Sequence, residues 1–329
     1  IAIDLAHPRA RDIVLDMARK VDVVVENFSP GVMQRYGFDE PNLRAVRPDL
    51  IYCAISGFGQ TGPLASMQAY AHLINAISGI MELERGGSTP PRVSYLQAAD
   101  VLAGAHAFGA ICAALLRRAR SGRGAFIDVS MLECLIAADD ITYSGLLNGA
   151  TVERQPRAGM LVHGVGDGHI ALQTAGAPHL WSRLVGVMNR PELLSDARFA
   201  TPLDRRRNWP ALAQVLREWL DRFDSVGHAV EVLSAARVPS VPMLTPEQVI
   251  EHPHLRARRA FPEVEHPARG SVRVTATPFH LDGAPVAPAG PAPHRVGEQT
   301  HEVLHDWLGY STQQIDSLVR DKVIEQAGE

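Results

Sequence analysis

A long stretch of the sequence, residues 98–116 (AADVLAGAHAFGAICAALL), contains one aspartate, one histidine and no lysine or arginine. Its length approaches what a helix needs to span a bilayer, but Asp100 and His106 are costly in lipid. We therefore expect a buried core helix and no membrane partner. Arginines follow at 117, 118 and 120, with Gly122 beyond, an ending that suits the negative end of a helix dipole.

Asp100 lies at the front of this stretch, and a buried acid is unfavourable unless it is paired, hydrogen-bonded or used chemically. If the helix begins near Gln97, the first turn and the helix dipole favour the ionised form by about 0.3–1 kcal/mol. Gly104 follows one turn later on the same face, where a ligand can come close. A desolvated carboxylate with open space beside it is suited to nucleophilic attack on an acyl group. The alternative is an acid at a helix N-terminus that only faces water.

Short apolar runs alternate with helical patterns in the first part of the chain. The expected strands are Ile1–Leu5, Val21–Glu26, Leu50–Ile55 and Ala125–Val129, and the expected helices include Arg9–Lys20 and Pro41–Val46. Alternation of this kind predicts βαβ units and a largely parallel sheet. We place Ile1 inside the second strand of a Rossmann-like sheet.

Charge and cysteine content narrow the functional classes. The formal net charge is −4 and there is no block of lysine or arginine, which argues against nucleic acid as a partner. Cys53, Cys112 and Cys134 form no CxxC pair, which is typical of buried thiols in a reducing compartment. With no signal-peptide pattern, we expect a cytoplasmic protein. No spacing of His, Cys or acidic residues indicates a metal site.

Five groups of short motifs occur in order along the chain. They are DVVVENF-x-PG at 22–31, SGFGQTGP at 56–63, AISG at 76–79, SGRGAFIDVS at 121–130 and VGEQT at 296–300. Together they resemble the family III CoA-transferases, the group that includes formyl-CoA, carnitine-CoA and succinyl-CoA transferases and the α-methylacyl-CoA racemases. The resemblance covers essentially the whole chain. It implies that the aspartate heading the apolar helix, Asp100, is the catalytic nucleophile.

The resemblance also implies an α/β fold, with a Rossmann-like large domain, a smaller inserted α/β domain and an interlocked homodimer. Residues 145–168 are rich in Gly, Arg and Pro, as in a linker. We assign 1–150 to the large CoA-binding domain, 151–260 to the small domain with its linkers, and 261–329 to a segment that returns to the large domain. Family members have a first strand, a glycine-containing turn and a helix before the point where this sequence begins. We therefore expect an N-terminally incomplete chain, or a unit supplied by another chain.

Residues 57–62 (GFGQTG) fit the glycine pattern of dinucleotide-binding turns, but such a turn must open a helix. Pro63 and an irregular stretch follow here, so NAD is not expected. A mobile glycine loop at the carboxyl edge of the sheet, where ligands of α/β proteins bind, is the better interpretation. The resemblance implies that Gly57, Phe58, Gly59 and Gln60 line the substrate pocket.

Asn27 and Phe28 end a buried strand at the same edge of the sheet. Taken alone, asparagine can cap a turn, phenylalanine can fill a core, and Arg35 can lie on a solvated helix face. The resemblance instead implies that Asn27 and Phe28 contact the adenosine end of coenzyme A and that Arg35 lies near its phosphates. We favour this interpretation because DVVVENF-x-PG is the best preserved of the motifs.

Tyr70 precedes the AISG motif in an expected helix. The resemblance implies a tyrosine at this substrate-pocket position in transferases and a histidine in racemases. Residues two apart on a helix differ by about 200°, so His72 should face away from Tyr70, and His106 should lie about 240° from Asp100. Because α-proton exchange needs a group within hydrogen-bond reach, transfer is favoured over racemisation. Ala71 and His72 depart from the family, which usually has an acidic and then an aliphatic residue after the tyrosine.

The expected reaction moves coenzyme A from an acyl-CoA to a free carboxylic acid through an aspartyl-CoA thioester. Acyl-CoA and the acid are substrates, and no cofactor or metal is permanently bound. Main-chain N–H groups of the glycine-bearing loops would stabilise the oxyanions. Two alternatives stay open: an α-methylacyl-CoA racemase that pairs Asp100 with a histidine, and a truncated, non-catalytic CoA-binding subunit.

Overall fold

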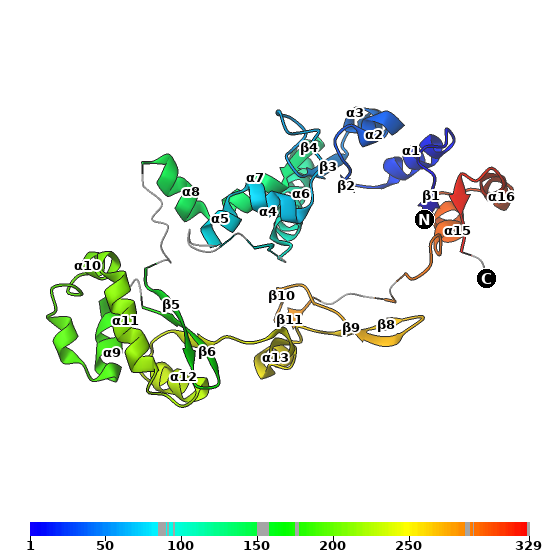
Figure 1. The fold of residues 1–329 in the computed structure, drawn as a ribbon. Coiled ribbons are helices and arrows are strands. Elements are labelled where there is room, and N and C mark those ends of the chain that lie inside the picture. The colour runs from blue at the N-terminus through cyan, green and yellow to red at the C-terminus, as the bar shows by residue number, and fades with distance from the viewer. Residues whose placement is uncertain are drawn as a thin grey trace. The chain divides into compact units, whose positions relative to one another are not determined.

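The computed structural model describes residues 1–84, 90, 92–94, 96–149, 158–174, 178–286, 290–291 and 293–327. They belong to two compact units, traced in Figure 1: unit 1 comprises Ile1–Arg154 and Ala292–Glu329, and unit 2 comprises Gln155–Pro291. The hairpins between residues 261 and 291 pair within themselves and are part of unit 2. The division at residue 261 that we expected from the sequence stays a prediction.

A three-stranded parallel sheet forms the centre of unit 1. β2 (Val23–Glu26), β3 (Ile51–Ser56) and β4 (Ala125–Ser130) lie in that order and are hydrogen-bonded to one another. β3 is the middle strand and is almost entirely buried, which explains why its sequence shows no polar alternation. The three strands confirm the expected parallel sheet, and their carboxyl ends meet at one edge.

Helices cover both faces of this sheet. α1 (Ala10–Lys20) and α3 (Glu40–Val46) place Ala18 and Leu43 against the face that carries Tyr52. Successive strand residues point to opposite faces. Cys53 therefore lies on the other face, where it packs in one core cluster with the alanines of α6 (Ala98–Ser121). The other helices of this part are α2 (Val32–Tyr36), α4 (Ala71–Ile77), α5 (Ile80–Glu84), α7 (Met131–Ala137) and α8 (Asp140–Leu147).

The N-terminal strand does not join this sheet. β1 (Ala2–Ile3) pairs antiparallel with β12 (Ile324–Glu325), and Ala2 N–H donates to Thr300 Oγ1 at 3.0 Å. Ile3 packs in a cluster with residues of the C-terminal elements. The placement of Ile1–Leu5 in a Rossmann-like sheet is therefore wrong here, because its backbone and side chains find partners at the far end of the sequence. Those C-terminal elements are α15 (Thr300–Glu302), the π-helix η2 (Val303–Trp307) and α16 (Thr312–Arg320).

Only one side of α6 is buried. Ala99, Ala103 and Ala107 pack on the core, whereas Val101, Phe108 and Leu116 on the opposite side are 68%, 61% and 57% exposed. Within the described residues, α6 is the one helix long and apolar enough to cross a membrane, and 22% of its most apolar window is buried. The expectation of a buried core helix is thus correct for the side that carries Ala99, Ala103 and Ala107 and wrong for the side that carries Val101, Phe108 and Leu116. We call the exposed side, with Val101, Phe108, Cys112 and Leu116, the outer face of α6.

Unit 2 combines an antiparallel sheet with helices that share its core. β5 (Met160–Val165), β6 (Gly168–Gln173) and β7 (Ser240–Pro242) lie in that order. Apolar residues of α9 (Pro178–Met188), α11 (Trp209–Leu220) and α12 (Val226–Ala235) form its core together with this sheet. The smaller elements are η1 (Pro191–Leu194), α10 (Pro202–Arg207), α13 (Pro246–Ile250), α14 (Pro253–Ala257), β8 (Glu263–His266), β9 (Gly270–Arg273), β10 (His280–Leu281) and β11 (Ala284–Pro285).

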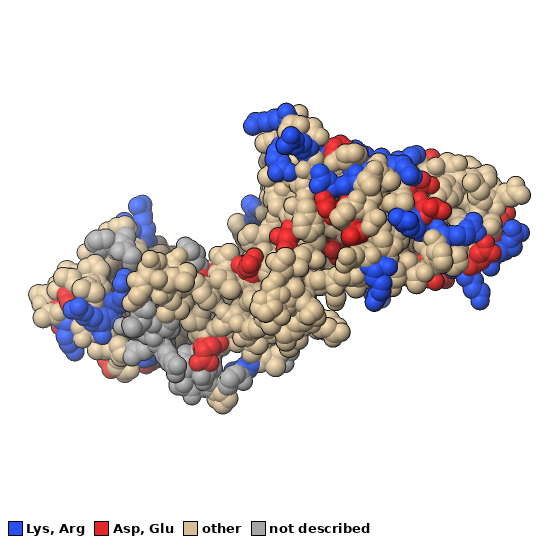
Figure 2. All heavy atoms as spheres, turned by 90° about the horizontal axis from the view of Figure 1, so that it is seen from above, with Lys and Arg blue, Asp and Glu red and all other residues tan. Residues whose placement is uncertain are grey.

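Acidic and basic side chains lie among one another on the face seen in Figure 2. Several of these charges are paired in unit 1. Asp22, just before β2, accepts from Arg47 at 2.7 Å and from Arg118 at 3.0 Å. Arg118 therefore does more than complement the dipole at the end of α6, since it also ties that end to the start of the sheet.

Candidate active site

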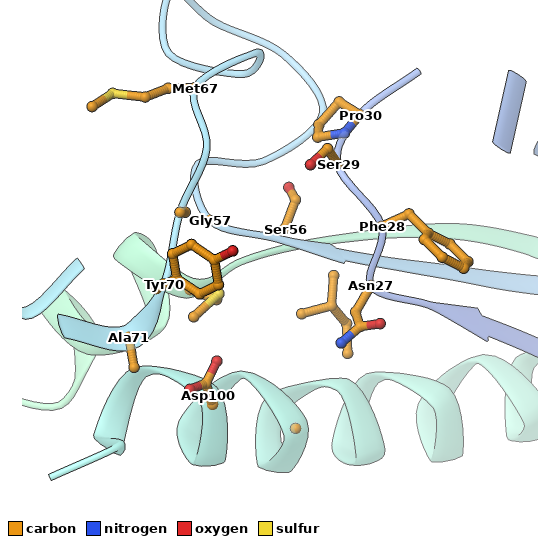
Figure 3. Close-up of a pocket in the computed structure, with 14 residues that line it drawn as sticks. Asn27, Phe28, Ser29, Pro30, Ser56, Gly57, Met67, Tyr70, Ala71 and Asp100 are labelled. Carbon is orange, nitrogen blue, oxygen red and sulfur yellow. The ribbon is translucent and has the colours of Figure 1, made fainter. Parts of the chain in front are cut away.

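A cavity of about 330 Å³ opens at the carboxyl edge of the parallel sheet. Its walls come from the ends of β2 and β3, the start of α6, the start of α7 and the segment before α4 (Figure 3). We call it the Asp100 cavity. It is lined by Asn27, Phe28, Ser29, Pro30, Ile55, Ser56, Gly57, Met67, Ala69, Tyr70, Ala71, Asp100, Gly104 and Met131.

Asp100 lies in the first turn of α6, which begins after Gln97 as expected. Its carboxylate points from the helix into the cavity (Figure 3), and the residue is exposed. The expectation of a desolvated acid is therefore wrong for the described residues, which leave the carboxylate open to solvent or ligand. A Cβ added at Gly104, one turn on, would meet no atom within 4 Å. The predicted open space beside the carboxylate is thus present.

The glycine loop that follows β3 is held by several contacts. An added Cβ at Gly57 would lie 2.1 Å from the Cβ of Ala69, and Gly59 has a φ of +85° that other residues rarely adopt. The Gln60 N–H donates to both carboxylate oxygens of Asp128, at 3.1 and 3.0 Å. The hydrogen bonds to Asp128 connect the loop to β4.

The loop residues divide between several environments. Gly57 lines the Asp100 cavity, whereas Phe58 packs against the core cluster under the sheet and Gly59 is buried beside Asp128. Gln60 lines a second, separate cavity of about 270 Å³. Of these four residues, which we predicted to line the substrate pocket, only Gly57 is in the described lining of the Asp100 cavity.

Asn27 and Phe28 both line the Asp100 cavity. The Phe28 N–H donates to Glu26 Oε2 at 2.8 Å, which fixes the turn at the end of β2. In Figure 3 the Asn27 amide points toward α6, while the Phe28 ring points the other way. Arg35 lies outside the cavity lining on α2, with its guanidinium 5.0 Å from the ring centre of Tyr36.

Tyr70 lines the Asp100 cavity, but it precedes α4 and has an extended backbone. The angle of about 200° between Tyr70 and His72 assumed that both lie on one helix, and it therefore does not apply. His72 is nevertheless directed elsewhere. His72 Nδ1 lies 3.0 Å from the Ser94 carbonyl oxygen and the residue is not in the cavity lining. His106 Nδ1 lies 2.8 Å from Leu102 O on its own helix, as expected for a structural histidine.

The second cavity collects acidic side chains around Tyr52. It is lined by Glu26, Asp39 and Glu40 together with Gln60, and we call it the Glu26 cavity. Burial raises the pKa of Glu26, and the hydrogen bond from Phe28 N–H partly offsets this rise. The pKa of Tyr52 is raised by burial and then by the nearby acids, beginning with Glu26.

The cysteines differ in environment. Burial raises the pKa of the Cys53 and Cys134 thiols, in line with the expected buried cysteines, whereas Cys112 is exposed on the outer face of α6. Within the described part of the chain, no three His, Cys, Asp or Glu side chains gather where they could hold a metal ion.

Several lining residues were missed from the sequence. Ser29 and Pro30 lie inside the DVVVENF-x-PG motif but were not singled out as site residues. Met67, Ala69 and Met131 lie outside the quoted motifs and carry no chemical pattern of their own. Ser56 was included in the SGFGQTGP motif but was not singled out. The available signal was its position, since the last residue of a central parallel strand lies at the edge where ligands bind.

Unit 1 is a mixed α/β fold with a parallel sheet and a carboxylate-bearing cavity at the carboxyl edge. Solved structures are similar in fold to this chain. The crystal structure of Rv3272 from M. tuberculosis matches with a TM-score of 0.76 and 26% identity, over 88% of this chain and 80% of that one. A CAIB/BAIF family protein from Brucella suis matches with a TM-score of 0.72 and 28% identity, over 93% and 80%. The chain belongs to CoA-transferase family III, whose family model matches residues 1–300.

Curated relatives agree with this membership. An acetyl-CoA:oxalate CoA-transferase from Acetobacter aceti is 35% identical, over 86% of this chain and 73% of the relative. A succinyl-CoA:glutarate CoA-transferase from Mus musculus is 28% identical, over 99% and 76%. The family uses CoA thioesters as substrates, and the resemblance drawn from the motifs is confirmed at that level.

Proposed function

We propose that this chain transfers coenzyme A from an acyl-CoA to a free carboxylic acid, with Asp100 as the nucleophile. The observation that carries this proposal is the position of Asp100. It is the only charged residue in the described lining of the cavity, and it stands at a helix N-terminus beside the open space at Gly104. A carboxylate so placed has room to meet an acyl carbon.

The proposed sequence has four balanced steps. An Asp100 carboxylate oxygen attacks the donor thioester carbonyl and the C–S bond breaks. CoA departs as a thiolate, and the donor acyl group and Asp100 form a mixed anhydride. The thiolate attacks the Asp100 carbonyl and releases the donor acid, which leaves an aspartyl-CoA thioester. The acceptor carboxylate attacks that carbonyl and displaces the thiolate, and the thiolate then attacks the acceptor acyl carbon and frees Asp100. Each intermediate keeps an activated acyl bond, so no other energy source enters.

The binding groups follow from the same cavity. Asn27 and Phe28 would hold the adenosine end of coenzyme A, and Arg35 would approach its phosphates when its guanidinium leaves the Tyr36 ring. Tyr70 and Gly57 would border the acyl group. The Gln60 N–H is already bonded to Asp128, so it is a poor candidate for the oxyanion donor expected from the glycine loop.

Racemisation is the second candidate, since the family includes racemases, and the described lining gives it less support. It needs a histidine near Asp100, and neither His72 nor His106 is among the lining residues. Replacing both histidines by glutamine should leave CoA transfer within about twofold of the unmodified rate. Racemisation of an α-methylacyl-CoA by the unmodified protein, lost in that double variant, would favour the racemase.

A homodimer is part of the proposal. The outer face of α6 is apolar and exposed, and burying it against a second copy would remove Val101, Phe108 and Leu116 from water. Light scattering coupled to size exclusion should give twice the mass of one chain. A mass equal to one chain at micromolar concentration would refute this part.

The direct test of the nucleophile uses intact-protein mass spectrometry. The protein is mixed with acetyl-, formyl-, succinyl- or oxalyl-CoA without acceptor, beside Asp100→Asn, which keeps the side-chain shape and removes the nucleophilic oxygen charge. We expect an added CoA mass on the unmodified chain alone, and hydroxylamine should release it as free CoA and leave a hydroxamate on Asp100. If no donor gives an adduct on a folded protein that binds CoA, the transfer mechanism is refuted.

A further inference from the structure

Ser56 is the last residue of β3, the central strand of unit 1, and lines the Asp100 cavity. Its side chain is 6% exposed, and its hydroxyl oxygen is buried without a hydrogen-bond partner. Among the described residues, four other buried polar atoms share this state, on Gln60, Asn75, Trp181 and Gln326, and none of these residues lines the cavity. Since nearly all buried polar groups in proteins are paired, this hydroxyl needs an explanation.

The Ser56 hydroxyl makes no hydrogen bond within the described residues, and a serine on the neighbouring strand shows the contrast. Ser130 ends β4 and is paired in register with Ser56. Its hydroxyl accepts the Glu133 N–H at 3.3 Å and so caps α7. Ser56 is followed by a glycine loop with no helix to cap. The two serines are equally buried, and only one of them is used by the protein.

The direction of Ser56 separates it from the reacting carboxylate. Side chains alternate along β3, so Cys53 and Ile55 face α6 while Ser56 faces the opposite side of the strand. Figure 3 shows its hydroxyl turned toward Ser29 and Pro30, with Asp100 on the α6 side. The cavity therefore passes around the end of β3. If Asp100 attacks one carbon of a ligand in this cavity, the segment of the ligand that contacts Ser56 is a different one, away from the reacting carbon.

The chemistry of the lining indicates which part this is. Apart from Asp100 the described lining is uncharged, and Ser56 is directed toward Ser29 and Pro30, which are also uncharged. A carboxylate buried here would have no cation, which is strongly unfavourable. The pantetheine arm of coenzyme A is neutral, combines amide groups with methyl and methylene groups, and is common to every acyl-CoA. We propose that the Ser56 hydroxyl hydrogen-bonds an amide of the pantetheine arm and so holds acyl-CoA beside Asp100.

This inference rests on the proposed function for the identity of the ligand, and it has its own readout. Binding of free CoA, followed by calorimetry, needs no chemistry at Asp100. Ser56→Ala should raise the dissociation constant of CoA about 3- to 10-fold, as the loss of one neutral hydrogen bond does. It should raise the KM of every acyl-CoA by the same factor and leave kcat unchanged, because the bond is equal in the ground and transition states.

Two variants provide controls. Ser56→Thr keeps the hydroxyl and should bind CoA within about twofold of the unmodified protein. Ser56→Ala removes an unpaired hydroxyl and should not lower the unfolding temperature, whereas Ser130→Ala removes a cap and should lower it while leaving CoA affinity unchanged.

Three results would overturn the inference. Unchanged CoA affinity in Ser56→Ala would mean that the hydroxyl has no partner in the ligand. A loss of kcat that depends on the acyl group would place the partner in the acyl moiety. A lowered unfolding temperature that accounts for the weaker binding would make the role structural.

The outcomes also separate this inference from the proposed function. If no donor ever modifies Asp100 but Ser56→Ala weakens CoA binding, transfer fails and the pantetheine contact stands. If Asp100 is modified and CoA affinity is unchanged, only the contact fails. If the unmodified protein binds no CoA at all, both are refuted.

Discussion

Replacing Gly104 by alanine adds one methyl group, which should raise the stability of the fold and lower the rate of the reaction at Asp100. The residue lies inside α6, and an added Cβ would meet no atom within 4 Å. Gly104→Ala should therefore gain the full helix-propensity difference, about 0.8–1.0 kcal/mol. For a unit of this size that is a rise of about 2–4 °C in unfolding temperature.

The same methyl group would enter the Asp100 cavity, because Gly104 lines it one turn from the carboxylate. Displacing the acyl carbon by about 1 Å from an attacking group can cost on the order of 100-fold in rate. We therefore expect Gly104→Ala to slow formation of the Asp100 adduct by about 10- to 100-fold.

Gly109 is the matched control. It lies in the same helix, an added Cβ there also meets no atom within 4 Å, and it does not line the cavity. Gly109→Ala should show the same thermal gain in scanning calorimetry and an unchanged rate in rapid-quench mass spectrometry. If the two variants react at equal rates, the acyl group does not bind beside Gly104 and the reasoning fails.

Other perturbations test separate parts of the molecule. Because burial raises the pKa of Glu26 above its ordinary value of 4.5, ionisation penalises the folded state as pH rises through that raised pKa. Glu26→Gln should therefore raise the urea midpoint at pH 7, and the gain should fade as pH falls through the raised pKa and be absent below about pH 4.5; a gain that persists unchanged at pH 4 would contradict this assignment. Gly57→Ala, whose Cβ would lie 2.1 Å from the Ala69 Cβ, should lower stability by about 1–3 kcal/mol in calorimetry, and an unchanged unfolding temperature would show that the segment before α4 yields freely. Cys112 alone should react with N-ethylmaleimide at pH 7 in the monomer and become protected on association, and equal labelling at all protein concentrations would argue against a partner on α6.

The parallel sheet and α6 were predictable because their signals are local. β3 is a continuous apolar run, and α6 begins after Gln97 and ends at Gly122 with a left-handed backbone, as the sequence suggested. β1 was misplaced because its pairing with β12 depends on residues more than three hundred positions away. No periodicity in a short strand contains that information.

The sequence predicted which residues share the cavity better than it predicted the exposure and direction of their side chains. Asp100, Asn27, Phe28, Tyr70 and Gly57 share one cavity, as their motifs indicated. The solvent exposure of Asp100 depends on what covers α6, and a helical pattern cannot report this. Phe58 and Gln60 belong to the same motif as Gly57, yet the turn at Gly59 directs them elsewhere. The role of Ser56 depends on the absence of a partner, which only atomic positions reveal.

The pairing of the two chain ends has a consequence for biosynthesis. Arg9 is bonded to Asp321, and the Lys20 ammonium donates to the Trp307 carbonyl, so α1 packs against residues that are translated about 300 positions later. At about 5–20 residues per second, the ribosome needs roughly 15–60 s to make the 312 residues that separate Arg9 from Asp321. During that interval the apolar side of α1 waits for α16 while unit 2 emerges between them. A nascent chain stalled before residue 300 should therefore be bound by chaperones through its N-terminal residues, with unit 2 already folded.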